Sequence, residues 1–225
     1  EALAYHSGVS WSAIAQIESG RRKDVRLSSL SALAEALGVS VDYLIGTTAT
    51  ITPPLLEHRL LTYGSDDEFV EAAVPFIAAG IEESDGLLAV TTKARIGLLR
   101  DALDERSRPV EFADSADWYR SPLAALNGYR AFVQQKYEAG APWVRIVGEP
   151  VWTGRSDAEI TSWIRYESLL NLALASLPAT IVCPYDTRSL PTAVVADARL
   201  THPEVAHGGD ATTNPTYREP EDFLL

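Results

Sequence analysis

The sequence predicts two domains, a small all-α domain followed by an α/β domain with a mostly parallel sheet. Residues 1–46 have the pattern of short helices separated by tight turns. Residues 47–57 are rich in Thr and Pro and show no helical period, which predicts an extended linker. From residue 58 onward, short apolar runs alternate with longer helical patterns, as in the crossover units of a parallel sheet.

The composition is that of an ordinary globular protein, with 225 residues of which 46% are hydrophobic and 22% charged. The net charge of -12 excludes bulk attraction to nucleic acid or to an anionic membrane, so any DNA contact needs a local basic cluster. No apolar run reaches the length of a membrane span, no signal peptide opens the chain, and Cys183 is the single cysteine. These features predict a cytoplasmic protein without membrane contact. Because the sequence contains no methionine, we expect its natural start to lie upstream.

The first domain carries the pattern of a helix-turn-helix. The run Gly8-Val9-Ser10 separates two short helices, and Ser10 is a good N-cap for the second, which we predict over 11–19. Ile14 and Ile17 are expected to face the core. A further helix is predicted over 27–37 from its apolar spacing, with Gly38 as its C-cap.

The second of these helices is the part that reads the major groove in such motifs. Gln16 is the most informative outward residue, because its amide can pair with N6 and N7 of adenine. The basic residues that follow the helix form the only dense basic cluster of the chain and are placed to meet phosphates. An alternative stays open, in which this domain is a helical packing module that does not contact DNA. The predicted DNA-binding residues are Trp11, Ser12, Ala13, Gln16, Ser19, Arg21, Arg22, Lys23 and Arg26.

This domain resembles the XRE (Cro-type) family of phage-repressor helix-turn-helix domains. The resemblance implies a five-helix DNA-binding domain of which this sequence begins at the second helix, so that helix 1 is missing. Trp11 and Ser12 depart from the residues usual in the family, and the operator sequence is therefore not predicted. The resemblance rests on Leu3-Ala4, Gly8-Val9-Ser10, Ile14, Ile17-Glu18-Ser19-Gly20, Leu30, Leu33-Ala34 and the run from Leu37 to Gly46.

The second domain is predicted over 58–205 from alternating strands and helices. Ser65 is the expected N-cap of its first helix. The polar tail over 206–225 is predicted to be irregular. Helices are predicted over 66–80, 94–106, 123–139, 157–176 and 190–200, and strands over 87–91, 110–113, 143–147 and 180–183, the last of which ends at Pro184.

The sequence argues against a nucleotide-binding enzyme. The strand at 87–91 is followed by Thr92-Lys93-Ala94-Arg95-Ile96-Gly97, which lacks the glycines of a phosphate-binding loop. No Gly-x-Gly-x-x-Gly follows any predicted strand. We therefore predict no enzymatic activity and no cofactor.

Three polar clusters predict a small-molecule pocket at the carboxyl edge of the sheet. Glu149 follows the strand at 143–147, and Asp186 follows the strand that contains Cys183. Glu167 and Asn171 share one helix face, where a buried carboxylate or amide needs partners. More ordinary roles stay open, namely an ion pair of Glu167 with Arg145 or Arg165 and a helix cap at Asp186. The predicted ligand-binding residues are His58, Arg145, Glu149, Trp152, Trp163, Glu167, Asn171, Tyr185 and Asp186.

A metal site can be combined from His58, His202, Cys183, Asp186 and Glu149. No tight spacing such as His-x-x-x-His or Cys-x-x-Cys supports it, so we predict no metal. The apolar neighbours of Cys183 also argue against a catalytic Cys–His pair.

The second domain resembles the MEDS family, the methanogen/methylotroph DcmR-type sensory domain. The resemblance implies a RecA/KaiC-like α/β fold that has lost its phosphate-binding loop, and it implies sensing of small molecules such as hydrocarbon derivatives. It rests on His58, Gly148-Glu149-Pro150, Arg165-Tyr166-Glu167, Asn171, Cys183-Pro184-Tyr185-Asp186 and Thr201-His202-Pro203.

Together these patterns predict a transcription regulator that responds to an unknown small-molecule effector. We expect a homodimer on a double-stranded DNA operator, with half-sites about one helical turn apart. Two alternatives stay open for the α/β domain: a protein-protein interaction module, or a degenerate nucleotide-binding enzyme whose ATP or GTP turnover would be lost in Glu149→Gln.

Overall fold

The computed structural model describes residues 2–22, 24–37, 39, 41–44, 55–207 and 209–223. The chain divides into two compact units, one over residues 1–53 and one over residues 54–225. Among the described residues, no helix combines the length and the apolar character needed to cross a membrane.

The first unit is entirely helical in its described part. Its turn between α1 and α2 is made by Gly8, which has a φ of +66° that a side chain would disfavour, and by Ser10, whose hydroxyl caps α2 by accepting from the Ala13 amide. Ile14 of α2 and Leu33 of α3 are buried in its small core. The helices are α1 (Ala2–Ser7), α2 (Trp11–Glu18), α3 (Leu27–Leu37) and α4 (Val41–Leu44).

The second unit is built on a seven-stranded sheet with the order β3-β2-β4-β5-β1-β6-β7. Every neighbouring pair is parallel except β6 and β7, which pair antiparallel. The strands are β1 (Glu57–Tyr63), β2 (Gly86–Thr91), β3 (Val110–Asp114), β4 (Val144–Gly148), β5 (Ala179–Asp186), β6 (Glu204–His207) and β7 (Asp210–Thr213).

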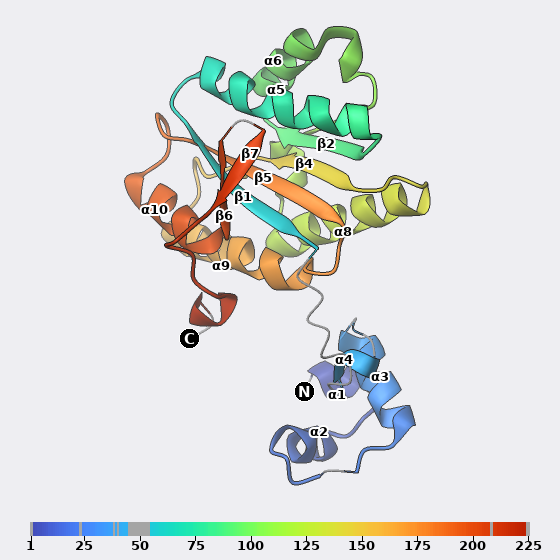
Figure 1. The fold of residues 1–225 in the computed structure, drawn as a ribbon. Coiled ribbons are helices and arrows are strands. Elements are labelled where there is room, and N and C mark those ends of the chain that lie inside the picture. Colours follow the sequence, from blue (N-terminus) through green and yellow to red (C-terminus); the bar gives the residue numbers. More distant parts are fainter. Residues whose placement is uncertain are drawn as a thin grey trace. The chain divides into compact units, whose positions relative to one another are not determined.

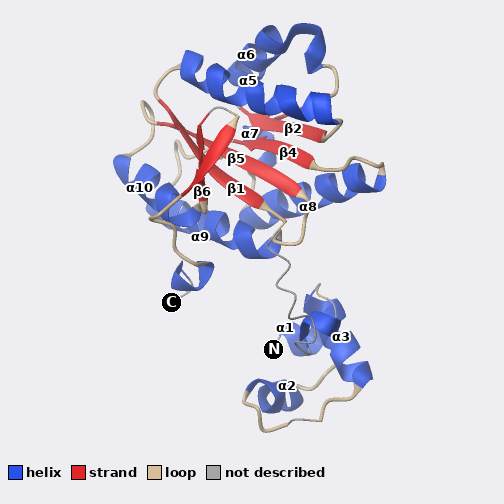
Figure 2. Cartoon of the chain, in the orientation of Figure 1, coloured by secondary structure: helices blue, strands red, loops and turns tan. Residues whose placement is uncertain are grey.

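Helices cover both faces of this sheet, as Figures 1 and 2 show. One face packs its apolar side chains against α5 and α6, and the opposite face packs against α8, α9 and α10. Central strands buried on both faces explain why the sequence shows short apolar runs rather than alternation. The helices are α5 (Asp66–Glu83), α6 (Lys93–Leu103), α7 (Ser115–Trp118), α8 (Pro122–Glu138), α9 (Asp157–Ala173) and α10 (Thr192–Thr201), with 3-10 turns at Asp104–Ser107 and Pro220–Phe223.

The predicted helices and strands of the second domain are confirmed, with ends that differ by a few residues. One exception is the strand at 180–183, because β5 continues through Pro184 to Asp186. The ladder with β4 ends at Val182, whereas β1 pairs as far as Asp186. Beyond Val182 the strand therefore has one partner only, and a residue without an N–H is tolerated there.

The second unit also begins earlier than predicted, because residues 55–57 are part of it and not of the linker. The amides of Leu55 and Leu56 donate to the Ala175 carbonyl, and Leu56 is buried. Glu57 is the first residue of β1, a strand that the sequence patterns did not predict. The rest of the predicted linker, over 47–54, lies outside the described residues.

The tail over 206–225 is not irregular as predicted. Residues 204–207 and 210–213 form the hairpin β6–β7, which extends the sheet beyond β1. Asn214 follows and is buried, with its side-chain amide donating to the carbonyls of Arg199 and His202. The chain after α10 is therefore packed against the sheet edge and the end of that helix.

Candidate functional site

The helix α2 presents its predicted reading residues to solvent. Trp11 is 64% exposed, Ser12 and Gln16 are exposed, and Ala13 is half-buried, whereas Ile14 lies in the core. Gln16 therefore lies on the solvent-exposed face of α2.

The residues after α2 form an exposed basic segment. Arg21, Arg22 and Arg26 are all exposed, while Lys23 lies outside the described residues. Ser19, in contrast, is the C-cap of α2, and its hydroxyl donates to the Ala15 carbonyl at 2.7 Å. The arginines can neutralise phosphates, which adds affinity without reading sequence.

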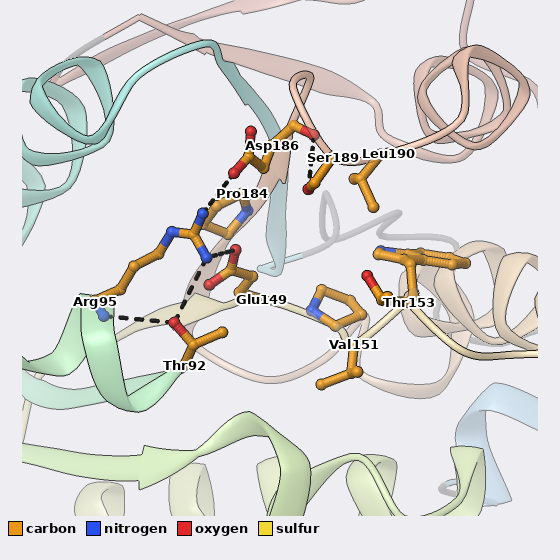
Figure 3. A pocket seen from close by; sticks show the side chains of 11 residues that line it. Thr92, Arg95, Glu149, Val151, Thr153, Pro184, Asp186, Ser189 and Leu190 are labelled. Carbon is orange, nitrogen blue, oxygen red and sulfur yellow. Dashed lines mark hydrogen bonds and ion pairs between the residues drawn. The ribbon is translucent and has the colours of Figure 1, made fainter.

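A pocket opens at the carboxyl edge of the sheet, where β2, β4 and β5 end (Figure 3). Arg95, in the first turn of α6, points into it and joins two carboxylates: its guanidinium lies 3.0 Å from Glu149 and 2.7 Å from Asp186. The lining residues are Thr92, Arg95, Glu149, Pro150, Val151, Trp152, Thr153, Pro184, Asp186, Ser189 and Leu190.

The Glu149 carboxylate is held by three side chains. The hydroxyl of Tyr63 donates to it at 2.7 Å, the hydroxyl of Thr91 donates to its other oxygen, and Arg95 pairs with it. Glu149 is only 6% exposed, so these partners replace the water that a charged group otherwise needs. A carboxylate fixed in this way orients Arg95 instead of acting as a free base.

Asp186 is fixed by two arginines. Arg188 donates to its carboxylate from the side chain and the backbone, and Arg95 reaches it from α6. The Arg188 hydrogen bonds, helped by the charge of Arg95, hold the pKa of Asp186 below its usual range. Asp186 therefore stays ionised, and it is not a helix cap, because α10 begins only at Thr192.

The pocket suits a ligand of a few heavy atoms. Its volume is about 100 Å³, well below the roughly 300–1,000 Å³ of sites for drug-sized molecules. One wall carries the Arg95 guanidinium, whose Nε has no hydrogen-bond partner among the described residues, and the other carries Trp152 and Leu190. This arrangement can bind a small molecule with one polar and one apolar end.

The structure does not bring all predicted ligand-binding residues to this edge. Glu149, Trp152 and Asp186 line the pocket. Arg145 lies instead at the amino end of β4, where it pairs with Asp85 and Glu83. That carboxylate pair, and not Glu167, is its partner.

Trp163 and Tyr185 are buried in the aromatic core beneath the sheet. The Trp163 ring packs edge-on against Tyr119 and Tyr166. The ring of Tyr185 lies 5.8 Å from those of Trp152 and His202. Tyr185 therefore connects the aromatic wall of the pocket with the interior.

His58, Glu167 and Asn171 belong to a second polar group in that interior. His58 donates from Nδ1 to the Asn171 side-chain oxygen at 3.0 Å, and its Nε2 lies 3.3 Å from Cys183 Sγ. His202 completes the group, with its Nε2 3.5 Å from the Glu167 carboxylate. Of the possible metal ligands considered from the sequence, His58, His202 and Cys183 thus meet Glu167, whereas Glu149 and Asp186 lie in the pocket.

Burial controls the charge of this interior group. It lowers the pKa of His58 to about 4 and that of His202 to about 3. It raises the pKa of Glu167 to about 7, and it also raises the pKa of the Cys183 thiol. Both imidazoles are therefore neutral at pH 7 and present lone pairs, as metal ligands do.

Sequence patterns missed Arg95, which lines the pocket, and the two hydroxyls that hold the Glu149 carboxylate, those of Tyr63 and Thr91. Tyr63 lies on β1, a strand that was not predicted. Thr91 is the last residue of the apolar strand β2, and nothing in the sequence distinguishes it from other threonines at strand ends. Arg95 carries a sequence signal, because it lies in the first turn of a helix that directly follows the carboxyl end of a strand, where ligands of open α/β sheets bind.

The family described as MEDS, the MEthanogen/methylotroph, DcmR Sensory domain, matches residues 57–203. This span is most of the chain and begins at the first residue of β1. The chain belongs to the MEDS family.

The helix-turn-helix family matches residues 1–44, in agreement with the resemblance drawn from the sequence. No curated protein and no solved structure shows a significant match to this chain. Both polar groups, the pocket at the sheet edge and the buried group, lie within the MEDS domain.

Proposed function

We propose that this protein is a DNA-binding transcription regulator whose MEDS domain binds a small molecule in the pocket at the carboxyl edge of the sheet and thereby changes operator affinity. The observation that carries the sensory part is the Arg95 guanidinium fixed between Glu149 and Asp186 in a pocket with an apolar wall. A preorganised cation beside an aromatic side chain is the arrangement expected of a specific small-molecule site.

The DNA-binding part rests on the helix-turn-helix match and on the exposed face of α2. Gln16 is its candidate base-reading residue, and the arginines that follow are candidate phosphate contacts. We propose that the protein binds as a homodimer, because half-sites spaced by a helical turn are read by two copies of such a motif.

The pocket chemistry favours a sensor over a nucleotide-binding enzyme. We infer a RecA/KaiC-like sheet that lacks a phosphate-binding loop, because Thr92 caps α6 directly after β2 and Gly97 is the one glycine in that run. The volume of about 100 Å³ supports a ligand far smaller than a nucleotide.

A titration against the DNA that flanks the protein's own gene tests the DNA-binding part. We expect Gln16→Ala to weaken specific binding by about 1–3 kcal/mol, because one bidentate base contact is lost. Arg21→Ala is expected to weaken binding to all sequences and to lower the slope of log K against log salt by about 1. Ser31→Ala, at an exposed site of α3, is the control. Equal affinity of wild type for operator and scrambled duplex would contradict specific reading.

A fragment screen tests the sensory part. Small polar-apolar molecules are scored first by thermal shift and then by their effect on operator affinity. Ser189→Phe places a ring at the mouth of the pocket and is expected to abolish binding of true ligands, whereas Ala193→Phe, exposed on α10 and outside the pocket, is not. If compounds that bind the wild type never change operator affinity, the interaction-module alternative is favoured.

A further inference from the structure

Four side chains of the types that can bind a metal ion meet in the interior of the MEDS domain, and none of them lines the pocket at the sheet edge. His58 comes from β1, Cys183 from β5, Glu167 from α9 and His202 from the C-cap of α10. One donor atom of each lies within 4.8 Å of the other three. Each residue is at most 2% exposed, so the group is closed to bulk solvent.

Three of the six distances between the donor atoms match those of a coordination tetrahedron, and all six are at most 4.8 Å. His58 Nε2 lies 3.3 Å from Cys183 Sγ and 3.6 Å from Glu167 Oε2, which in turn lies 3.5 Å from His202 Nε2. Zinc bonds of about 2.0–2.1 Å to nitrogen or oxygen and about 2.3 Å to sulfur place tetrahedral ligand atoms roughly 3.3–3.6 Å apart. Contacts of 3.5 and 3.6 Å are also too long for hydrogen bonds between the same atoms.

Hydrogen bonds outside the group fix which nitrogen of each histidine faces it. His202 Nδ1 contacts the Ala198 carbonyl at 2.7 Å, and a carbonyl only accepts, so this nitrogen carries the proton. Asn171 uses its amide nitrogen to donate to the Thr201 carbonyl, so its oxygen faces His58 and accepts from Nδ1. Both Nε2 atoms therefore present lone pairs to the centre of the group. Metal-binding histidines are held by outer hydrogen bonds of this kind.

The centre of the group is consequently rich in acceptors and poor in donors. Two imidazole lone pairs and the Glu167 carboxyl group face one another, and the groups that can donate a proton to them are the Cys183 thiol and the Glu167 carboxyl when it is protonated. Among the described residues, Glu167 Oε2 and His202 Nε2 have no hydrogen-bond partner. Burying such atoms unsatisfied is costly, and a bound cation would satisfy all four at once.

We propose that His58, Glu167, Cys183 and His202 bind a divalent transition metal of the zinc class. Two imidazoles, a thiolate and a carboxylate are ligands that suit zinc, whereas magnesium and calcium prefer sites made of oxygen alone. Four protein ligands fill a tetrahedral sphere, so the ion is structural and leaves no open position for a substrate. The site is independent of the effector pocket.

The ion would join four separate elements of the domain. It connects the adjacent strands β1 and β5 to the middle of α9 and to the residue at which α10 ends. Because such a site does not exist in the unfolded chain, the free energy of metal binding contributes directly to folding. Metal loading is then a requirement for the stable fold of the sensory domain.

The first test measures metal in the untagged full chain. The protein is unfolded with a chelator, desalted, and refolded with or without zinc. We expect one zinc ion per chain to survive gel filtration, and a higher unfolding midpoint in the loaded protein. Refolding with cobalt should give thiolate-to-cobalt charge-transfer absorption together with the intense visible bands of four-coordinate cobalt.

Matched variants assign the ligands. Cys183→Ser is expected to lose the charge-transfer band, and Asn171→Ala to weaken zinc binding about 10–100-fold because it frees the His58 ring. Tyr185→Phe removes a buried hydroxyl that has no hydrogen-bond partner in the described part of the chain and lies two residues from Cys183. His207→Gln removes an exposed histidine. Both variants should bind zinc as the wild type does.

The proposal is overturned if wild-type protein refolded without metal has the same unfolding midpoint and retains no added zinc. It is equally overturned if cobalt binds without a thiolate band, or if Cys183→Ser shows the wild-type spectrum. The wild-type cobalt spectrum remains decisive even where a ligand variant fails to fold.

Discussion

At the scale of single residues, Glu149 and Asp186 show how one sheet edge holds two carboxylates with different hydrogen-bond partners. Glu149 accepts from two hydroxyls and is buried, whereas Asp186 is bound by arginines on both sides. Arg95 touches both and so depends on both for its position. The geometry of the pocket is thus set by ionic contacts more than by apolar packing.

The contribution of the Asp186 charge to the free energy of unfolding should depend on pH, and Asp186→Asn removes that charge. Because its pKa in the folded protein is lower than in the unfolded chain, its stabilisation is present above about pH 4 and is lost as the pH falls through the folded pKa. We expect Asp186→Asn to lower the free energy of unfolding by about 1.5–3 kcal/mol at pH 7. The difference from wild type should shrink below about pH 4, as measured by urea unfolding over a pH series.

Asp101→Asn, on the exposed side of α6, is the control and should change little at any pH. If the free energies of unfolding of wild type and Asp186→Asn differed by the same amount at pH 3 and pH 7, the carboxylate charge of Asp186 would contribute nothing to stability.

The sequence predicted the site residues that lie at the ends of strands, and it missed contacts that form only between distant parts of the chain. Glu149 follows β4 and Asp186 is the last residue of β5, and the carboxyl ends of parallel strands meet at one edge. Arg145 fails this rule because it lies four residues before Glu149, about 13 Å along the strand. The spacing of His58 and His202 in the sequence does not indicate that they lie close together. The two residues come together only when β6, which follows His202, pairs with β1.

At the scale of elements, Gly80 shows how a local preference yields to packing. It lies inside α5, where alanine is normally better by about 0.5–1 kcal/mol. A Cβ at this position would lie 2.6 Å from Leu87 Cδ2 and 2.7 Å from Arg145 Cδ. Leu87 is buried, and Arg145 is held by Asp85 and Glu83, so neither side chain can move away freely.

We therefore expect Gly80→Ala to destabilise the protein by about 1–3 kcal/mol through overpacking. Gly97→Ala is the matched control, because it lies in α6 with no atom within 4 Å of the new Cβ, and it should stabilise by about 0.5–1 kcal/mol. Urea midpoints of the two variants measure the contrast. Stabilisation by both substitutions would contradict a close contact between α5 and the sheet.

Helices with a strong period of apolar residues were predictable from the sequence, whereas short strands that form only by pairing with a neighbouring strand were not. The helices α5, α8 and α9 are long enough to show their apolar spacing. The strands β6 and β7 have four residues each and exist because β1 offers an edge for pairing. Pro184 lies within β5 and does not end it, because the tolerance of proline depends on where the ladder with β4 stops, and that is a property of the whole sheet.

At the scale of the whole molecule, the two units differ greatly in their cores. Among the described residues of the helical unit, Ile14, Leu33 and Ala34 are the buried apolar side chains, whereas the MEDS unit has a core on each face of its sheet. The sheet order follows from which crossover passes over which face, and no local pattern encodes it. The sequence therefore predicted the class of each unit but not the strand that would be central.

A sensory role requires that the two units be coupled, and coupling is reciprocal. If a ligand in the MEDS domain changes operator affinity by some factor, operator binding must change ligand affinity by the same factor, and hence the state of the pocket. We expect operator DNA to alter amide hydrogen exchange in 149–153 and 186–190, the segments that line the pocket, as well as in α2. A scrambled duplex, or operator with Gln16→Ala protein, should leave the pocket segments unchanged at the same concentration. Exchange that changes in α2 alone would show that DNA binding does not reach the pocket, and the MEDS domain would then act on transcription by another route than operator affinity.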